Sequence, residues 1–183
     1  MGAQNKLLLP VDGEAMVINA LRAACHSGAD AVCLVTGHER ERILKLAGPF
    51  EITEAYNADF ALGQNKSIAV GLEKLQGTNR SVLVLLADQP AVNAELLTEL
   101  LLAHRHDGGH RALVPTYQGQ WGTPRILPSA LVRQAALAKG ALSMRQVLSD
   151  NAQSLQLYEL NDPAVIKDID TPADYLQYTQ RKF

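Results

Sequence analysis

The stretch Ser81-Val82-Leu83-Val84-Leu85-Leu86-Ala87-Asp88 decides the fold. A run that is almost wholly apolar is typical of a strand buried on both faces, and this one ends in a carboxylate. On its carboxyl side, helical periodicity runs from Asn93 to about Arg105, with Asn93 at the N-cap position. On its amino side, the apolar run from Ala31 to Val35 predicts a second buried strand. We therefore expect a sheet whose two faces are covered by helices.

The same alternation of strand and helix continues along the chain. Further strands are predicted at 50–56, 111–115 and 155–160, and further helices at 14–27, 38–46, 66–75, 130–138, 143–149 and from 171 onward. This alternation predicts an α/β fold with a mainly parallel sheet and right-handed crossovers. Glycine and proline punctuate residues 117–128, where no element is predicted. No linker or repeat interrupts the pattern, so residues 1–183 are predicted to form a single domain.

Composition and charge exclude several classes of protein. The chain has 183 residues, 47% apolar and 20% charged, which excludes a disordered or fibrous protein. Its net charge of −2 gives no basic surplus, so no nucleic-acid partner is expected. The first apolar run stops at Pro10, far short of a membrane span, so no membrane partner is expected. Cys25 and Cys33 are interpreted as small buried hydrophobes in a reducing cytosol, which predicts a cytoplasmic protein.

The chemistry is expected where strands deliver side chains to the carboxyl edge of the sheet. Asp88 leaves the strongest strand and is followed by the turn Gln89-Pro90. A carboxylate in this place is either functional or the cap of the next helix, but Asn93 is better placed as the cap. Asp168 and Asp170 point to one side of the chain if their segment is extended. With Asp88 they predict a Mg²⁺ site, since Mg²⁺ is usually held by one or two carboxylates plus substrate phosphates.

Other segments offer ligand-binding groups, each with an ordinary structural alternative. Lys6 suits a phosphate or is a solvated surface lysine. Gly63 to Ser67 opens onto a helix whose free N–H groups suit an anion, or forms an ordinary loop. Trp121 to Pro124 suits a flat ligand, or Trp121 is a partly buried loop aromatic. Thr171-Pro172 has the pattern of an N-cap followed by proline at the first helical position.

Several familiar motifs are absent from the sequence. It contains no G-x-x-x-x-G-K-[ST] phosphate loop, no G-x-G-x-x-G fingerprint and no G-x-S-x-G elbow. Gly108-Gly109 separates His110 from His104 and His106. An exposed helix end whose histidines face solvent is therefore favoured over a metal site there.

Six segments, taken in order, resemble the motifs of one enzyme family. They are Met1-Gly2-x-x-Asn5-Lys6-Leu7-Leu8-Leu9-Pro10, Asn57-x-x-Phe60-x-x-Gly63-x-x-x-Ser67, Leu86-Ala87-Asp88-Gln89-Pro90, Gly122-Thr123-Pro124, Ser143-Met144-Arg145-Gln146-Val147-Leu148 and Asp168-Ile169-Asp170-Thr171-Pro172-x-Asp174. Over essentially its whole length the chain resembles the MobA-like nucleotidyltransferases, nearest to the molybdenum cofactor cytidylyltransferases. Thr123 stands where the family's G-[HN]-P step has histidine or asparagine.

This resemblance implies a fold, a reaction and a set of roles. The fold would be a Rossmann-like three-layer sandwich of the nucleotide-diphospho-sugar-transferase type. The reaction would transfer CMP from CTP to the terminal phosphate of molybdopterin, releasing pyrophosphate, with Mg²⁺ as cofactor and a molybdoenzyme or its chaperone as a further partner. The implied site residues are Lys6 and Asp88 for catalysis, Lys6, Gly63, Ser67, Asp88, Gln89 and Pro90 for the nucleotide, Gly122, Thr123 and Pro124 for the acceptor, and Asp88, Asp168 and Asp170 for the metal.

The resemblance starts inside the family's first motif. The family has a strand, an L-A-A-G-x-S loop and an arginine before the positions matched by Met1-Gly2, and the sequence does not contain them. Either the true start lies upstream, or the protein is shortened and has a gap in its sheet. In the second case we expect the strands on either side of the gap to lack backbone partners, and catalysis is in question even with Asp88 intact.

Two alternative functions stay open at this point. One is a nucleotidyltransferase that uses another phosphate acceptor, such as a sugar or polyol phosphate. The other is a non-catalytic protein that binds a nucleotide or a pterin. The choice among CTP, GTP and ATP also stays open, because the loop that helps to set it is not in the sequence.

Overall fold

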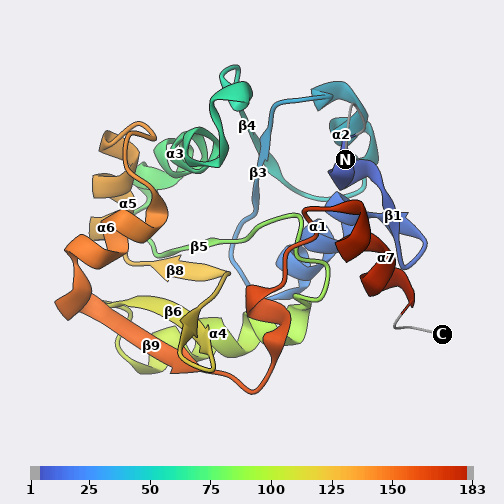
Figure 1. Cartoon of the computed structure of the whole chain (residues 1–183). Coiled ribbons are helices and arrows are strands. Elements are labelled where there is room, and N and C mark those ends of the chain that lie inside the picture. The colour runs from blue at the N-terminus through green and yellow to red at the C-terminus, as the bar shows by residue number, and fades with distance from the viewer. Residues whose placement is uncertain (1–4, 181–183) are drawn as a thin grey trace.

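A computed structural model describes residues 5–180, and its largest sheet has five strands (Figure 1). These are β5 (Val82–Val84), β6 (Ala112–Tyr117), β7 (Gln120–Trp121), β8 (Arg125–Leu127) and β9 (Leu155–Glu159). Their order is β5-β8-β6-β7, and β9 also pairs with β6. β8 is antiparallel to both β5 and β6, whereas β9 is parallel to β6. Hence β5, β6 and β9 run the same way, as the prediction of a mainly parallel sheet requires.

The remaining strands form two smaller units. β1 (Pro10–Val11) and β2 (Glu14–Ala15) make an antiparallel hairpin, and β3 (Cys33–Thr36) and β4 (Thr53–Tyr56) make a parallel pair. Helix α3 contacts both β3 and β5, yet no strand pairing joins these two strands within residues 5–180. The break agrees with the expectation that strands at the centre of the sheet lack a partner. The Met1-Gly2 part of the first motif lies outside the described residues.

Seven α-helices surround these strands in the described part of the chain. They are α1 (Met16–His26), α2 (Arg40–Ala47), α3 (Gln64–Leu75), α4 (Ala94–His106), α5 (Ser129–Leu137), α6 (Met144–Asp150) and α7 (Pro172–Gln180), with 3-10 turns η1 (Lys6–Leu8), η2 (Phe60–Leu62), η3 (Gln76–Thr78), η4 (Ala152–Ser154) and η5 (Pro163–Ile166). Asn93 caps α4 as predicted, because its side-chain oxygen accepts the Leu96 N–H at 2.9 Å. None of these helices is both long and apolar enough to cross a membrane.

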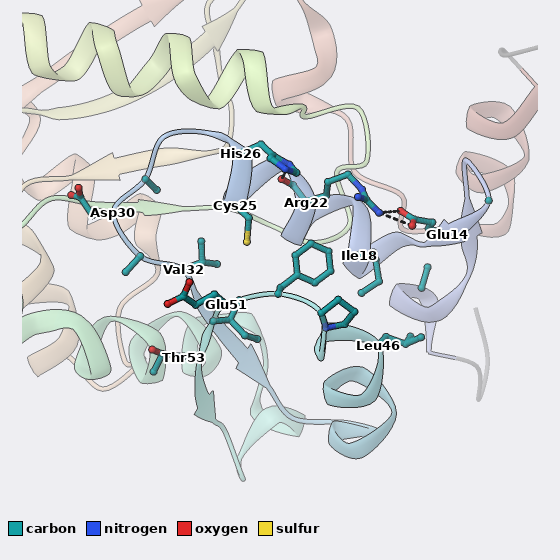
Figure 2. A pocket seen from close by; sticks show the side chains of 17 residues that line it. Glu14, Ile18, Arg22, Cys25, His26, Asp30, Val32, Leu46, Glu51 and Thr53 are labelled. Carbon is teal, nitrogen blue, oxygen red and sulfur yellow. Dashed lines mark hydrogen bonds and ion pairs between the residues drawn. The ribbon is translucent and has the colours of Figure 1, made fainter.

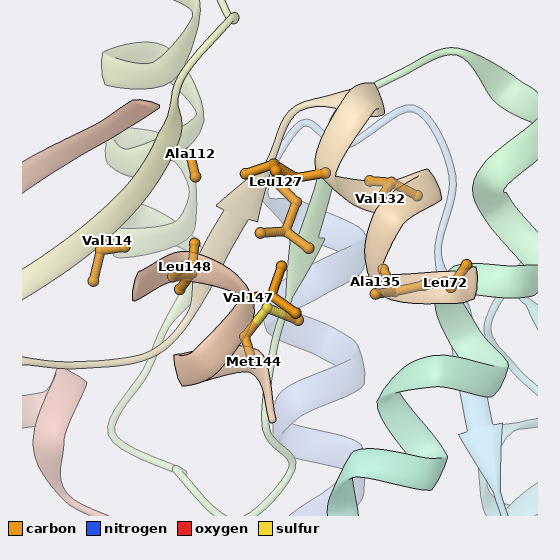
Figure 3. Close-up of a cluster of buried hydrophobic side chains, with 11 residues drawn as sticks. Leu72, Ala112, Val114, Leu127, Val132, Ala135, Met144, Val147 and Leu148 are labelled. Carbon is orange, nitrogen blue, oxygen red and sulfur yellow. The ribbon is translucent and has the colours of Figure 1, made fainter. Parts of the chain in front are cut away.

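The two faces of the five-stranded sheet are covered by different helices, which gives three layers. Successive residues of a strand point to opposite faces. In β8, Leu127 packs with α3, α5 and α6 in the cluster shown in Figure 3, while Ile126 packs with α4 in a second cluster. Residues from β6 divide in the same way, with Val114 in the first cluster and Leu113 in the second. The predicted helix-covered sheet is confirmed for this part of the molecule.

Three local predictions differ from the structure. Of the strand predicted over 81–87, only Val82–Val84 forms β5. Within residues 5–180 it pairs with β8 alone, and β8 is three residues long. The same strand is half-buried rather than fully buried. Residues 117–128, predicted to hold no element, contain β7 and all of β8. Strands this short between glycines and prolines leave no periodic pattern.

The prediction for the histidine cluster was wrong at one residue. His104 is only 4% exposed, and its Nε2 lies 2.9 Å from Ser81 Oγ at the start of β5. It extends the buried stripe of α4 formed by Leu97 and Leu100, at spacings of three and four residues. His106 and His110 are exposed, as predicted.

Candidate active site at the carboxyl end of β5

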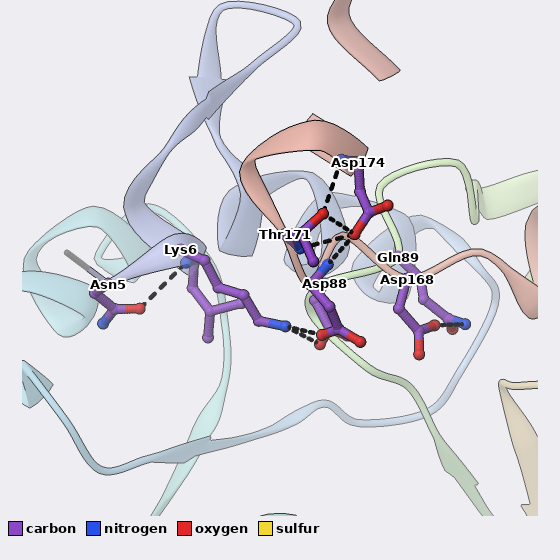
Figure 4. A network of polar contacts seen from close by, with 9 residues as sticks. Asn5, Lys6, Asp88, Gln89, Asp168, Thr171 and Asp174 are labelled. Atoms are coloured by element: carbon purple, nitrogen blue, oxygen red, sulfur yellow. Dashed lines mark hydrogen bonds and ion pairs between the residues drawn. The ribbon is translucent and has the colours of Figure 1, made fainter. Parts of the chain in front are cut away.

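The site is centred on Lys6, which lies between two carboxylates. Its Nζ is 2.8 Å from Asp88 Oδ2 and 2.6 Å from Asp170 Oδ1 (Figure 4). Asn5 orients the turn that carries Lys6, because its side chain accepts the Leu7 N–H at 3.1 Å. Partial burial lowers the pKa of Lys6, but its hydrogen bonds to Asp170 and Asp88 outweigh this effect and leave that pKa raised. Lys6 is therefore held as a cation, not free in solvent as its alternative interpretation required.

Asp88 joins the exit of β5 to the segment that precedes α7. Its backbone carbonyl accepts the Ile169 N–H at 2.9 Å. Because Ile169 is buried, the residues on either side of it, Asp168 and Asp170, are held near Asp88. The Asp88 side chain is 13% exposed, and its Oδ1 is buried without a hydrogen-bond partner among residues 5–180. A buried carboxylate oxygen with no partner is costly unless a ligand or cation reaches it.

Gln89 is a support for the site and does not face it. The side chain is 2% exposed, so the residue predicted to bind nucleotide is buried. Its amide nitrogen donates to Asp168 Oδ1 at 2.6 Å (Figure 4). Its amide oxygen accepts the Thr123 hydroxyl at 2.7 Å. Gln89 thus fixes Asp168 relative to the loop that contains Thr123. Pro90 follows it in the turn and is half-buried.

The ionisation of Asp168 is set by its surroundings. Partial burial of the carboxylate raises the pKa of Asp168; the Gln89 hydrogen bond opposes this, and the charges of Asp88 and Asp170 add to it. Asp170 is far more open, with 67% of its side chain exposed. The three aspartates therefore have different environments although they lie at one end of the molecule.

The segment Gly122-Thr123-Pro124 packs against η5. Thr123 donates its backbone N–H to Val165 O at 2.8 Å. A Cβ placed on Gly122 would lie 2.5 Å from the same carbonyl oxygen, so the close approach requires glycine. Gly122 and Pro124 are buried and Thr123 is half-buried. Of the three predicted acceptor residues, only Thr123 has an accessible side chain, and its hydroxyl is already bonded to Gln89.

The predicted nucleotide loop lies at the start of α3. Gly63, with φ of 105°, precedes the first turn of that helix. Ser67 accepts a hydrogen bond from the buried Asn57, whose Nδ2 is 3.0 Å from its hydroxyl. In the part of the chain that the structure describes, no hydrogen bond or ion pair links Gly63 or Ser67 to Lys6. The loop follows β4 and η2 along the chain.

The start of α7 accounts for the rest of the acidic motif. Thr171 donates its hydroxyl to Asp174 Oδ2 at 2.8 Å and accepts the Asp174 N–H at 3.1 Å. This is a capping box, with Pro172 at the first helical position as predicted. The Asp174 carboxylate accepts hydrogen bonds within this cap, whereas the Asp170 carboxylate accepts one from Lys6.

The predicted divalent-cation site fits in its chemistry but is not preformed. Asp88, Asp168 and Asp170 supply the carboxylate oxygens that Mg²⁺ prefers, and Asp88 Oδ1 is unpartnered. Within residues 5–180, however, no three His, Cys, Asp or Glu side chains converge as a metal site. The reason is that Lys6 fills the space between Asp88 and Asp170, and Gln89 holds Asp168. These carboxylates would hold a divalent cation once Lys6 moves.

A sizeable cavity lies elsewhere, at the amino ends of β3 and β4. It has a volume of about 1040 Å³ and is lined by α1 and by residues 29–32 and 49–53. Figure 2 shows Cys25 and Val32 on its walls and the Arg22–Glu14 ion pair at one side. None of the predicted site residues lines it. Ligands of such sheets bind at the carboxyl ends of the strands, which is the end where Lys6 and Asp88 lie and not the end with this cavity.

Comparison with known proteins defines the class of this protein. The model of the MobA-like NTP transferase domain matches residues 1–156. The chain belongs to this family of nucleotidyltransferases, as its motifs predicted.

Individual relatives are more distant. Purine catabolism protein PucB of Bacillus subtilis is 26% identical over 181 residues, covering 94% of this chain and 86% of PucB. Molybdenum cofactor cytidylyltransferase of Escherichia coli is 24% identical over 180 residues, covering 97% and 88%. The bifunctional protein GlmU of Pelobacter propionicus is 36% identical over 104 residues, 56% of this chain, and the match spans 22% of GlmU.

Solved structures confirm the fold. The crystal structure of Rv0371c from Mycobacterium tuberculosis has a TM-score of 0.84 at 18% identity, covering 97% of this chain and 90% of that one. The manganese complex of Rv0371c has a TM-score of 0.82 at 19% identity, with coverage of 97% and 93%. The predicted nucleotidyltransferase fold is therefore correct.

Proposed function

We propose that this protein transfers CMP from CTP to the terminal phosphate of molybdopterin and releases pyrophosphate, in a reaction that requires Mg²⁺. Molybdopterin as acceptor and CTP as donor rest on the motif resemblance and on similarity to a molybdenum cofactor cytidylyltransferase. The requirement for a divalent cation is supported by the manganese complex of a protein with the same fold. A molybdoenzyme or its chaperone would receive the product.

One observation carries the proposal. At the exit of β5, the buried Asp88 offers an unpartnered carboxylate oxygen beside the cationic Lys6. Nucleotidyl transfer from a triphosphate is helped by a cation that neutralises phosphate oxygens and by carboxylates that hold a divalent metal. This pair combines them at the edge of the sheet where ligands of α/β folds bind.

The reaction follows from positioning and charge. A phosphate oxygen of the acceptor forms a bond to the α-phosphorus of CTP, and the bond from that phosphorus to pyrophosphate breaks. Lys6 stabilises the negative charge that grows on the phosphate oxygens. When bound at Asp88, Asp168 and Asp170, Mg²⁺ supplies neutralisation of the triphosphate charge. Because the acceptor is itself the nucleophile, no covalent intermediate on the protein is needed.

The test is pyrophosphate release from CTP, GTP and ATP, with and without molybdopterin. We expect release with CTP only when molybdopterin is present, and no burst before it is added. The Asp88→Asn variant keeps the shape of the side chain but loses its charge, so turnover should fall by at least about a hundredfold. Asp30→Asn is the matched control, because Asp30 precedes β3 at the opposite end and pairs with Arg80.

Other outcomes would redirect the assignment. A preference for GTP moves the protein to guanylyl transfer, and activity only with sugar or polyol phosphates replaces molybdopterin as acceptor. An Asp88→Asn variant as fast as its parent overturns the role of Asp88. No turnover with any donor and acceptor favours the non-catalytic nucleotide- or pterin-binding alternative.

A further inference from the structure

Two arginines outside the predicted site lie within electrostatic range of each other, one of them opposite the end of β5. Arg125 begins β8 and pairs with Val84, the last ladder residue of β5, four positions before Asp88. It alternates with Ile126, so its side chain points to the same face as Leu127, toward α6. Arg145 is in α6, with its guanidinium 5.9 Å from the centre of the Trp121 ring. No local sequence signal distinguishes Arg125 from a surface residue, whereas Arg145 lies in the segment Ser143 to Leu148 that resembles a family motif.

Neither arginine has a carboxylate partner among residues 5–180. Arg125 uses its Nε to donate to Gly122 O at 2.9 Å. Its terminal nitrogens make no hydrogen bond there and are not among the buried unpartnered atoms, so they reach solvent. Ion pairs with carboxylates occupy the arginines at 22, 40, 42, 80 and 111. The pair at 125 and 145 is therefore a local surplus of positive charge.

This surplus is costly without an anion. Burial, and then the charge of Arg145, lower the pKa of Arg125. Two like charges beside a half-buried aromatic ring destabilise each other, and an anion between them removes that repulsion. Guanidinium groups also match the geometry of phosphate oxygens, to which they donate two hydrogen bonds. By contrast, Lys6 has two carboxylate partners.

We infer that Arg125 and Arg145 bind the phosphate group of the acceptor substrate, with Trp121 packing against the adjoining part of that molecule. The inference rests on the proposed function, in which a phosphorylated acceptor must lie next to the donor nucleotide. The placement suits this role, because Gly122-Thr123 connects Trp121 to Gln89 and Asp168. The nucleotide triphosphate then belongs to the Lys6 and Asp88 side, and the acceptor phosphate to the arginine side.

The single tryptophan of the chain is a direct probe of this site. Glycerol 3-phosphate, a minimal phosphorylated acceptor, is titrated while Trp121 fluorescence is followed, with glycerol as the uncharged control. We expect a saturable change with the phosphate compound alone. Arg145→Gln should weaken the binding by about tenfold or more, the loss of one charge-assisted contact. Arg133→Gln on α5 is the matched control, since Arg133 is exposed and bonds only Asn79.

Three results would overturn the inference. The first is a fluorescence change with glycerol equal to that with glycerol 3-phosphate. The second is that Arg145→Gln and the wild type bind glycerol 3-phosphate with equal affinity. The third is that Arg145→Gln loses as much affinity for CTP as for glycerol 3-phosphate. The last result would assign the arginines to the triphosphate. Arg125→Gln is tested in the same way as Arg145→Gln. If it fails to fold, Arg125→Lys takes its place, and its melting temperature with and without glycerol 3-phosphate replaces the titration. Binding at Trp121 with no pyrophosphate release from any nucleotide would refute the proposed function and leave the anion site standing.

Discussion

At the scale of single residues, Gln89 shows how a buried amide sets the position of a carboxylate. Its replacement by methionine keeps the volume but leaves the Thr123 hydroxyl and Asp168 without their partner. We expect the free energy of unfolding of Gln89→Met to fall by about 1–3 kcal/mol in urea denaturation. Gln146→Met is the control, since Gln146 also donates to an aspartate but is exposed, and its effect should stay within about 0.5 kcal/mol. Equal losses in both variants would contradict the bridging role.

Lys6 competes with a divalent cation for the same carboxylates. In Lys6→Met, Asp88 and Asp170 lose their ion pair, so Mn²⁺ without nucleotide should bind about tenfold more tightly than to the wild type. The measurement is free Mn²⁺ by electron paramagnetic resonance at pH 8. Lys45→Met, on the exposed side of α2, removes one charge elsewhere and should leave the affinity unchanged. Unaltered Mn²⁺ binding in Lys6→Met would mean that Lys6 does not occupy the cation position.

At the scale of elements, the contact between α4 and the start of β5 depends on a neutral His104. Burial lowers the pKa of His104 below its usual value near 6.5. Between the lowered pKa of His104 in the folded protein and its usual pKa in the unfolded chain, the unfolded chain binds more protons. The stability that the neutral His104 contributes is therefore complete above about pH 6.5 and is lost as the pH falls. The difference in unfolding free energy between wild type and His104→Gln should therefore shrink from pH 7 to pH 5.

The control for this prediction lies on the same helix. His106 is exposed, so the difference between wild type and His106→Gln should stay flat over that range. The measurement is a series of urea transitions at half-unit pH steps. A His104→Gln difference that does not vary with pH would show that protonation of His104 is not linked to folding.

At the scale of the whole molecule, the break between the two sheets has a measurable signature. The carbonyl of Val32, just before β3, accepts the Thr53 N–H, and the carbonyl of Thr36 accepts the Asn57 N–H. Cys33 and Val35 therefore turn their backbone groups toward the other edge of β3. Within residues 5–180 no strand pairs with that edge. The Val35 amide should exchange with deuterium at least about tenfold faster than the Leu34 amide. Equal protection of Leu34 and Val35 in solution would mean that another strand covers the edge.

Much of the architecture follows from the sequence by itself. Apolar runs and helical spacing are local properties, so they predicted the alternation of strands and helices, the Asn93 cap and the Thr171-Pro172 start of α7. Asp88 was found because a carboxylate that follows a buried strand is delivered to a defined edge of the sheet. The family motifs added the fold, which the comparison with solved structures confirms.

The tertiary structure alone decided which side chains meet. Lys6 and Asp88 are separated by 82 residues, and Gln89 and Asp168 by 79, so no local pattern links them. His104 was misplaced because a polar residue looks solvated until its buried partner is known. Nothing local in the sequence indicates that Gln89 is buried. β8 and Arg125 escaped prediction because a three-residue strand is stabilised by its neighbours and not by its own periodicity. Local propensity selects the elements, whereas burial and long-range pairing, which form only when the chain is folded, build the site.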